Sequence, residues 1–139
     1  MADTLDELQR NLKRLASNIA NKNNERQVYL NQADEIQRVY NRLLQDKKTI
    51  NGFRKDINSF YNKSYSDFKG NNFKSTYKPA VEDLRDAYDD VIGNIDSNLD
   101  ALNNKILEYK NKASNCLGPI GMLESAYNSA KTQILNWTN

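Results

Sequence analysis

The stretch Ser64-Tyr65-Ser66-Asp67-Phe68-Lys69-Gly70-Asn71-Asn72-Phe73 interrupts a helical pattern at the middle of the chain. On both sides apolar residues recur at helical spacing, whereas Ser, Asn and Gly prevail inside it. Gly70 supplies the backbone freedom that a tight reversal needs, and the rings of Phe68 and Phe73 can pack between two arms. The stretch therefore predicts a turn at about 64–72 that folds two helices back on each other. A plain loop between two helices is the alternative interpretation.

The first arm, about 4–63, opens with a capping box in which Thr4 caps the helix and Glu7 reaches back to it. Apolar residues then follow gaps of three and four, the spacing of a heptad seam, at Leu5, Leu8, Leu12, Leu15 and Ile19. This register continues to Phe68 without a shift. It predicts one long helix, which Gly52 allows to bend.

Two pairs of basic residues interrupt this seam, Lys22 with Arg26 and Lys47 with Arg54. Long basic side chains can lay their aliphatic stems on an apolar surface and keep the charge in water. Two interpretations stay open for both pairs. Either the core becomes thinner at these points, or the charges specify the register with a partner helix.

The second arm, about 73–113, contains Pro79 near its start. Either Thr76 caps the helix with Pro79 in the first turn, or a short helix from about Asn72 kinks at Pro79. The seam shifts once, in a region where Gly93 can allow a close helix approach. Its members are Tyr77, Val81, Leu84, Tyr88, Val91, Ile95, Leu99, Leu102, Ile106, Tyr109 and Ala113. Arms of comparable length joined by a short loop pack antiparallel.

A third amphipathic segment, about 119–137, follows an interruption from Ser114 to Gly121. Its only charged residues are Glu124 and Lys131, so we expect the helix to be covered. Either it folds back on its own arms or it docks on a partner, and we favour a partner that covers at least part of the hairpin. Its apolar residues are Ile120, Leu123, Tyr127, Ala130, Ile134 and Trp137, the last of which serves packing or recognition.

The fold that these patterns predict is all-α, a single domain over residues 1–139 with a long antiparallel helical hairpin and a short C-terminal third helix. The net charge of +2 does not suggest nucleic acid. No apolar run approaches the ~20 residues of a membrane span, and the first residues lack the pattern of a standard signal peptide.

Enzymatic chemistry is not expected either. The chain has no histidine and one cysteine, Cys116, which excludes Ser-His-Asp and Cys-His catalysis and the common zinc sites. No glycine-rich phosphate loop occurs. The segment from Asp96 to Asp100 imitates the start of a calcium loop, but Ala101 and Leu107 occupy positions that require Gly and Glu. We therefore expect no catalytic residues, no metal and no cofactor.

The central turn between two amphipathic arms resembles the WXG-motif superfamily of small helical proteins tied to type VII secretion in Gram-positive bacteria. Phe68-Lys69-Gly70 occupies the place of Trp-x-Gly, with Phe instead of Trp. The length, Phe73 and the segment Gly118-Pro119-Ile120-Gly121 look most like the larger partner proteins encoded beside LXG-type toxins.

The resemblance implies a non-enzymatic accessory protein that binds the N-terminal helical LXG region of a secreted toxin. It would act as a targeting factor or co-secreted chaperone, together with a second small helical protein in some complexes. It would be cytoplasmic or co-exported. The family's Tyr-x-x-x-Asp/Glu export signal is absent, because no tyrosine here has an acidic residue four positions later. That signal would therefore come from another chain.

Particular residues are expected to carry these roles. Phe68, Gly70 and Phe73 would hold the turn, and partner contacts would fall on Leu5, Leu8, Leu12, Leu15, Ile19, Ile120, Leu123, Tyr127, Ile134 and Trp137. Two other functions remain open. One is a self-associating structural coiled coil, for which a homodimer is the simplest form, and the other is an immunity protein that masks a toxin.

Overall fold

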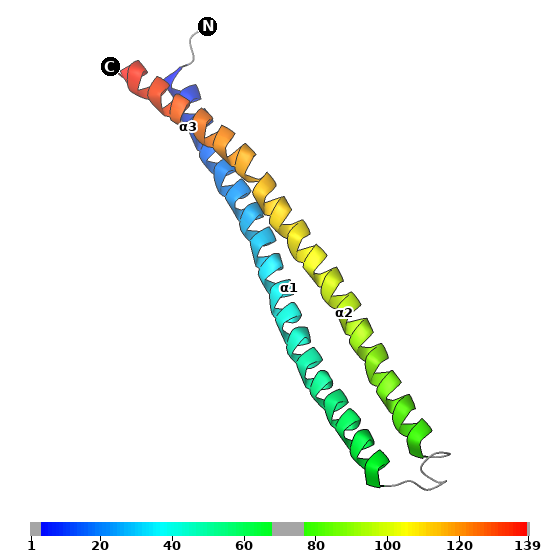
Figure 1. Ribbon diagram of the computed structural model, residues 1–139. Coiled ribbons are helices and arrows are strands. Elements are labelled where there is room, and N and C mark those ends of the chain that lie inside the picture. Colours follow the sequence, from blue (N-terminus) through cyan, green and yellow to red (C-terminus); the bar gives the residue numbers. More distant parts are fainter. Residues whose placement is uncertain (1–3, 68–76, 139) are drawn as a thin grey trace. The chain divides into compact units, whose positions relative to one another are not determined.

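The computed structural model describes residues 4–67 and 77–138 of the chain (Figure 1). These ranges form three helices, α1 (Leu5–Asp67), α2 (Lys78–Asn115) and α3 (Leu117–Thr138). No strand occurs in the described ranges, and the all-α prediction is confirmed. The predicted turn residues Phe68, Gly70 and Phe73 lie outside the described residues.

The start of α1 is fixed by the predicted capping box. The backbone N–H of Thr4 donates to Glu7 Oε2, and the backbone N–H of Glu7 donates to Thr4 Oγ1, both at 3.2 Å. Each side chain thus satisfies a backbone donor that has no acceptor within the first turn. The acidic residues Asp6 and Glu7 also lie in this turn, where the helix dipole favours negative charge.

The helix ends differ from the expected boundaries around the centre of the chain. α1 continues to Asp67, so the first residues of the predicted turn at 64–72 are helical. The segment 64–67 contains neither Gly nor Pro, and a helix can continue through it. α2 begins at Lys78 and places Pro79 in its first turn, where the missing N–H costs no helical hydrogen bond.

The junction between α2 and α3 is a single residue, Cys116, and is much narrower than the expected interruption from 114 to 121. Pro119 explains the junction, because it has no N–H to donate to the carbonyl of Asn115. The Cys116 N–H instead bonds the Ala113 carbonyl at 3.1 Å, a tighter turn than the α-helix. The Ile120 N–H then bonds the Cys116 carbonyl at 3.0 Å and resumes the helical pattern.

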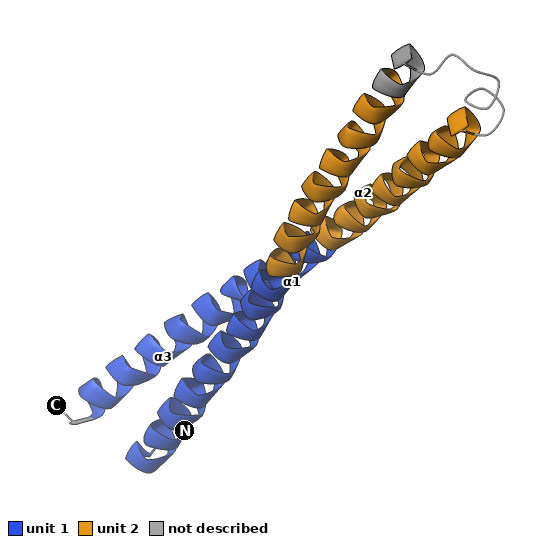
Figure 2. Ribbon diagram, turned by 90° about the horizontal axis from the view of Figure 1, so that it is seen from below, with its two compact units in different colours: residues 1–35, 105–139 blue, residues 36–104 orange. Residues whose placement is uncertain are grey.

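The chain divides into two compact units, which share α1 and α2 (Figure 2). Unit 1 joins residues 1–35 to residues 105–139, and unit 2 comprises residues 36–104.

Unit 1 packs the first part of α1 along the end of α2 and along α3. The ring of Tyr29 stacks on that of Tyr109 with centroids 6.4 Å apart, and Lys112 Nζ lies 5.9 Å and 5.1 Å from these two rings. The buried apolar residues of this unit are Leu8, Leu15, Ala33, Ile106, Ala113, Cys116, Ile120 and Ala130. Apolar side chains three and four residues apart on facing helices therefore form its core.

Unit 2 has a thinner core, in which Ile95 and Leu99 are the buried apolar residues. The seam of α2 differs here from the prediction. Leu84 and Val91 are exposed, and their places are taken by half-buried Arg85 and Ile92. The seam therefore does not shift at this point. Gly93 does not serve a close approach either, because a Cβ built on it would meet nothing within 4 Å.

The corrected seam is a regular heptad series. From Val81 a series of buried and half-buried residues of α2 follows gaps of four and three without a slip, and it passes through Cys116 into α3 as far as Ile134. Cys116 is a member of this series, which explains why a residue at a helix junction is buried. Across the described helices, no segment has both the length and the apolar character that crossing a membrane requires.

Candidate interaction surfaces

Three cross-helix polar contacts join α1 to α2 in unit 2, and we call them the polar ladder. Lys47 Nζ lies 2.5 Å from Asp96 Oδ1, Arg54 Nε donates to Asp89 Oδ1, and the Tyr61 hydroxyl donates to Glu82 Oε1 at 3.4 Å. Each contact lies seven residues further along α1 and seven residues back along α2. The contacts therefore join α1 and α2 of this unit at regular seven-residue intervals.

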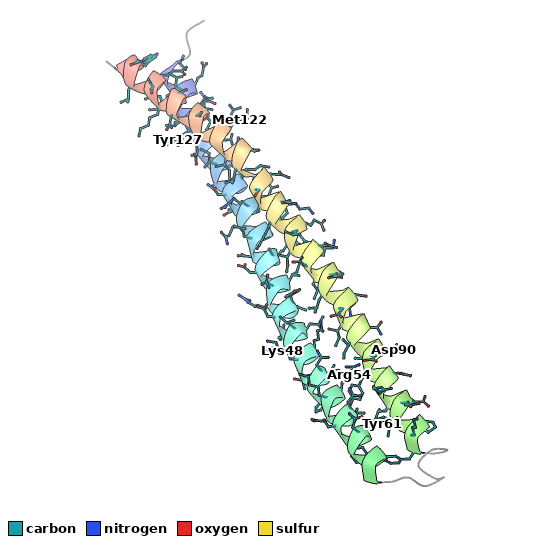
Figure 3. The ribbon with its side chains drawn as sticks, in the orientation of Figure 1. Lys48, Arg54, Tyr61, Asp90, Met122 and Tyr127 are labelled. Atoms are coloured by element: carbon teal, nitrogen blue, oxygen red, sulfur yellow. The ribbon has the colours of Figure 1, made fainter. Side chains whose placement is uncertain are left out.

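The structure gives observations that agree with both interpretations of the basic residues Lys47 and Arg54. The core of unit 2 is thin, and both side chains pair with carboxylates of α2 in the same unit. Figure 3 shows the side chains of Arg54 and Tyr61 on the side of α1 that faces α2. All the charged groups of the ladder are partly exposed, so each pair contributes about 0–1 kcal/mol and its main effect is on specificity.

The first pair of basic residues, Lys22 and Arg26, differs from Lys47 and Arg54 in its contacts. Lys22 Nζ bonds Glu25 Oε2 on its own helix at 3.0 Å, and this hydrogen bond raises the pKa of Lys22. Arg26 Nε is buried without a hydrogen-bond partner among the described residues, as is Gln32 Oε1. These two unsatisfied atoms mark a weak point of unit 1, since a buried polar atom without a partner costs free energy.

A second polar cluster lies on the surface of α2 in unit 1. Lys105 Nζ bonds Glu108 Oε2 at 2.9 Å, and Lys112 Nζ lies 3.6 Å from Glu108 Oε1. The hydrogen bond from Lys105 lowers the pKa of Glu108 and raises that of Lys105. Lys112 thereby links a carboxylate to the stacked rings of Tyr29 and Tyr109.

The edge of unit 2 that carries its exposed aromatic residues is apolar. Phe53 and Phe60 of α1 are seven residues apart, as are Leu84 and Val91 of α2, and Tyr77 precedes Leu84 by the same interval. The ring centroids of Phe60 and Tyr77 are 5.9 Å apart, which places the two rows on the same side of the unit. These five residues, 37% to 54% exposed, form what we call the apolar strip.

Unit 2 thus presents two chemically different edges. In the heptad register the ladder residues of α2 and the strip residues of α2 flank the seam on opposite sides. The edge with the polar ladder carries ion pairs between α1 and α2. The edge with the apolar strip carries large apolar side chains that are each about half exposed. Clustered exposed apolar residues of this kind are typical of interaction sites.

The sequence-predicted partner contacts lie elsewhere, in unit 1. Leu8, Leu15 and Ile120 are buried, and Leu5, Leu12, Ile19, Leu123, Tyr127 and Ile134 are half-buried. Trp137 is 54% exposed. The predicted contact residues of α1 and those of α3 lie in one compact unit, so most of these side chains already pack within the chain. α3 belongs to the same compact unit as residues 1–35, and it follows α2 after the single residue Cys116.

The sequence interpretation missed the apolar strip because it assigned Tyr77, Leu84 and Val91 to the seam itself. A signal was nonetheless present. Two apolar series run along α2 side by side, one through Val81 and Ile95 and one through Leu84 and Val91. The apparent shift of the seam was a crossing from the second series to the first.

The described residues hold no group of three or more potential metal ligands. A surface depression of about 500 Å³ near the start of α1 is lined by residues of that helix alone, namely Asp6, Gln9, Arg10, Leu12 and Lys13. Groups from a second element do not converge on it.

No family model matches the chain. No curated protein matches it. No solved structure matches it.

Proposed function

We propose that the chain is a non-enzymatic accessory protein of type VII secretion that binds the N-terminal helical LXG region of a secreted toxin, as a targeting factor or co-secreted chaperone. The proposal includes the finer fold that the sequence suggests, a long helical hairpin with α3 as a short third helix. The observation that carries it is how little of the described chain is fully covered.

No large side chain among the described residues is less than 2% exposed, and ten hydrophobic residues make up the whole buried core. A layer of two helices covers one side of each helix, whereas a three- or four-helix bundle closes around its core. A chain built in this way gains apolar burial when another helical protein completes the bundle. The N-terminal helical region of a toxin is a partner of the required chemistry.

The direct test is co-expression of the full chain with the tagged N-terminal region of an LXG-type toxin from the same genome. We expect the two to co-purify as a complex of defined mass by light scattering. Trp137→Ala should weaken this complex, because an exposed tryptophan at the end of α3 is available as an anchor worth about 2 kcal/mol. Tyr127→Ala should lower the stability of unit 1 as well, since that side chain is half-buried.

Met122→Ala is the matched control for α3. Met122 is 76% exposed, and Figure 3 places it on the other side of α3 from Tyr127. We expect this variant to bind the toxin region as the parent does. If the untagged chain never co-purifies with the toxin region, the accessory role is wrong.

One observation favours a second candidate, a self-associating structural coiled coil. The heptad series of α2 and α3 is unbroken from Val81 to Ile134, as in proteins whose helices pair over long distances. A stable homo-oligomer that excludes the toxin region would support this function over the accessory role.

A further inference from the structure

The α2 residues of the apolar strip, Tyr77, Leu84 and Val91, belong to a second seam on that helix. Ala80 lies between Tyr77 and Leu84, and Ala87 lies between Leu84 and Val91, with gaps of three and four throughout. Ala80 and Ala87 are exposed. Small residues alternating with large ones let another helix approach closely and seat its own apolar side chains between them. Phe53 and Phe60 of α1 are exposed as well, and the ring of Phe60 contacts that of Tyr77 at the side of this surface.

Carboxylates frame the surface on both sides. On α1, Asp56 lies three residues after Phe53 and four before Phe60, and Asp46 is seven residues before Phe53. On α2, Asp83 and Asp90 each follow an alanine of the second seam by three residues. All four are exposed, and none forms an ion pair with another residue in the described ranges. The four aspartates therefore offer negative charge to whatever covers the strip.

We propose that this surface binds an amphipathic helix of a partner protein, with apolar residues at heptad spacing and Lys or Arg along both of its edges. The apolar residues would fill the strip, and the cations would face the four aspartates. A second copy of this chain fits less well, because it would bring the same framing carboxylates toward one another. From Tyr77 to Val91 the strip spans roughly 21 Å of helix, so about four turns of the partner would be covered.

This inference does not rest on the toxin assignment, since the surface lies in unit 2 and the expected toxin contacts lie in unit 1. It specifies the chemistry of an occupant rather than its identity. A complex with the toxin region can fail to form while the strip still binds a cationic helix, and the reverse also holds.

The test uses the full chain and two synthetic helical peptides of about 21 residues. Both carry Leu at heptad a and d positions. The first has Lys at the flanking e and g positions, and the second has Glu there. Fluorescence anisotropy of labelled peptide gives each affinity, and sedimentation equilibrium gives the mass of the free chain. We expect the lysine peptide to bind at least tenfold more tightly than the glutamate peptide, and the free chain to be monomeric.

Paired variants locate the binding. The double variant Leu84→Gln with Val91→Gln should lower the affinity for the lysine peptide at least tenfold. The double variant Leu107→Gln with Leu117→Gln changes residues that are similarly exposed but lie outside the strip, and it should leave this affinity unchanged. Asp83→Lys with Asp90→Lys should reverse the peptide preference. Asp86→Lys with Asp100→Lys, exposed acids of the same helix that do not frame the strip, should keep the preference for lysine.

Circular dichroism at 222 nm checks that every variant keeps the parental helicity, which exposed positions permit. Equal binding by the strip variant and its control would overturn the proposal, and so would an unchanged preference after the Asp83 and Asp90 reversal. The proposal would also be overturned if the parent chain is a dimer and only the variant with Leu84→Gln and Val91→Gln is a monomer. A second copy of the chain would then cover the strip.

Discussion

Arg54 of α1 donates from Nε to Oδ1 of Asp89 on α2, across 35 residues of sequence. The neighbouring contacts, Lys47 with Asp96 and Tyr61 with Glu82, lie one heptad to either side. A slip of either helix by one turn would break all three contacts at once. The ladder therefore acts on register, although each contact is weak by itself.

Reversing one charge of the ladder should be destabilising, and reversing both should restore most of the loss. Arg54→Asp places two carboxylates opposite each other and is expected to cost about 1 kcal/mol. The double variant Arg54→Asp with Asp89→Arg should return close to the parental free energy of unfolding, measured in urea. Lys48→Asp, an exposed neighbour without a cross-helix partner among the described residues, is the control. Additive losses in the double variant would show that the two residues do not interact.

Adjacent residues of α2 should respond very differently to truncation. Ile106 is 3% exposed and Leu107 is 51% exposed. Ile106→Ala should cost about 2–5 kcal/mol, because it removes buried methylene groups and leaves a cavity. Leu107→Ala should change the free energy of unfolding by about 0.5 kcal/mol or less. Similar losses for the two variants would mean that Leu107 is covered in solution, as by self-association.

The capping box at the start of α1 should contribute measurably to stability. Thr4→Ala removes the hydroxyl that accepts from the Glu7 N–H and is expected to cost about 1 kcal/mol. Thr132→Ala is the control, since the Thr132 hydroxyl donates to the Asn128 carbonyl, which already belongs to a helix. Thermal unfolding compares the two, and equal melting temperatures would contradict a capping role.

Stability should be almost independent of pH between about 5.5 and 7.5, because the chain has no histidine. The pKa of Glu108 is lowered by its hydrogen bond from Lys105, so that contribution is present above pH 4.5 and is lost as pH falls through the lower folded-state pKa.

Lys22 and Lys105 act at the other end of the pH range. Hydrogen bonds to Glu25 and Glu108 raise their pKa values, so their contributions are present below pH 10.5 and are lost as pH rises through the higher folded-state pKa. Melting temperatures across the pH range should therefore form a plateau that declines at both ends. A transition centred near neutral pH would contradict this account.

The junction between α2 and α3 should depend on one proline. Pro119→Ala restores an N–H that can bond the Asn115 carbonyl, and we expect α2 and α3 to become one continuous helix. Amide hydrogen exchange should show new protection at residue 119, and stability should rise or stay unchanged. Gly121→Ala, also in α3 and at a position where an added Cβ would meet nothing within 4 Å, separates this effect from the general gain in helix propensity. Absence of protection at residue 119 would place the cause of the junction elsewhere.

The sequence predicted much of this fold, because helical spacing is a local property. The seam from Leu5 to Ile57 and the capping box at Thr4 could be derived from residue order, whereas the place of Pro79 in the second helix stayed open between two alternatives. The strip could not be separated from the seam by periodicity, because Leu84 and Arg85 are adjacent and either can continue a heptad. The choice depends on what Arg85 contacts across the unit, where its guanidinium lies 5.7 Å from the centre of the Tyr61 ring.

The acidic partner of each basic seam residue also could not be predicted from the local sequence pattern. Lys47 and Lys22 look alike in sequence, as seam residues with an apolar stem and a charged end. One reaches Asp96 of a distant segment and the other reaches Glu25 on its own helix. Only the register between the helices decides which acid lies within reach, and that register is a property of the whole unit.

The division of the chain has a consequence for how it reaches its native state. Unit 2 joins segments that are close in sequence, whereas unit 1 joins residues 1–35 to residues 105–139. Contacts between near segments cost less loop-closure entropy and form faster. During synthesis, unit 2 can therefore fold before residues 105–139 are available to pack on the first 35 residues. Until those residues have been synthesised, Leu8 and Leu15 stay uncovered and can contact a helix of another protein.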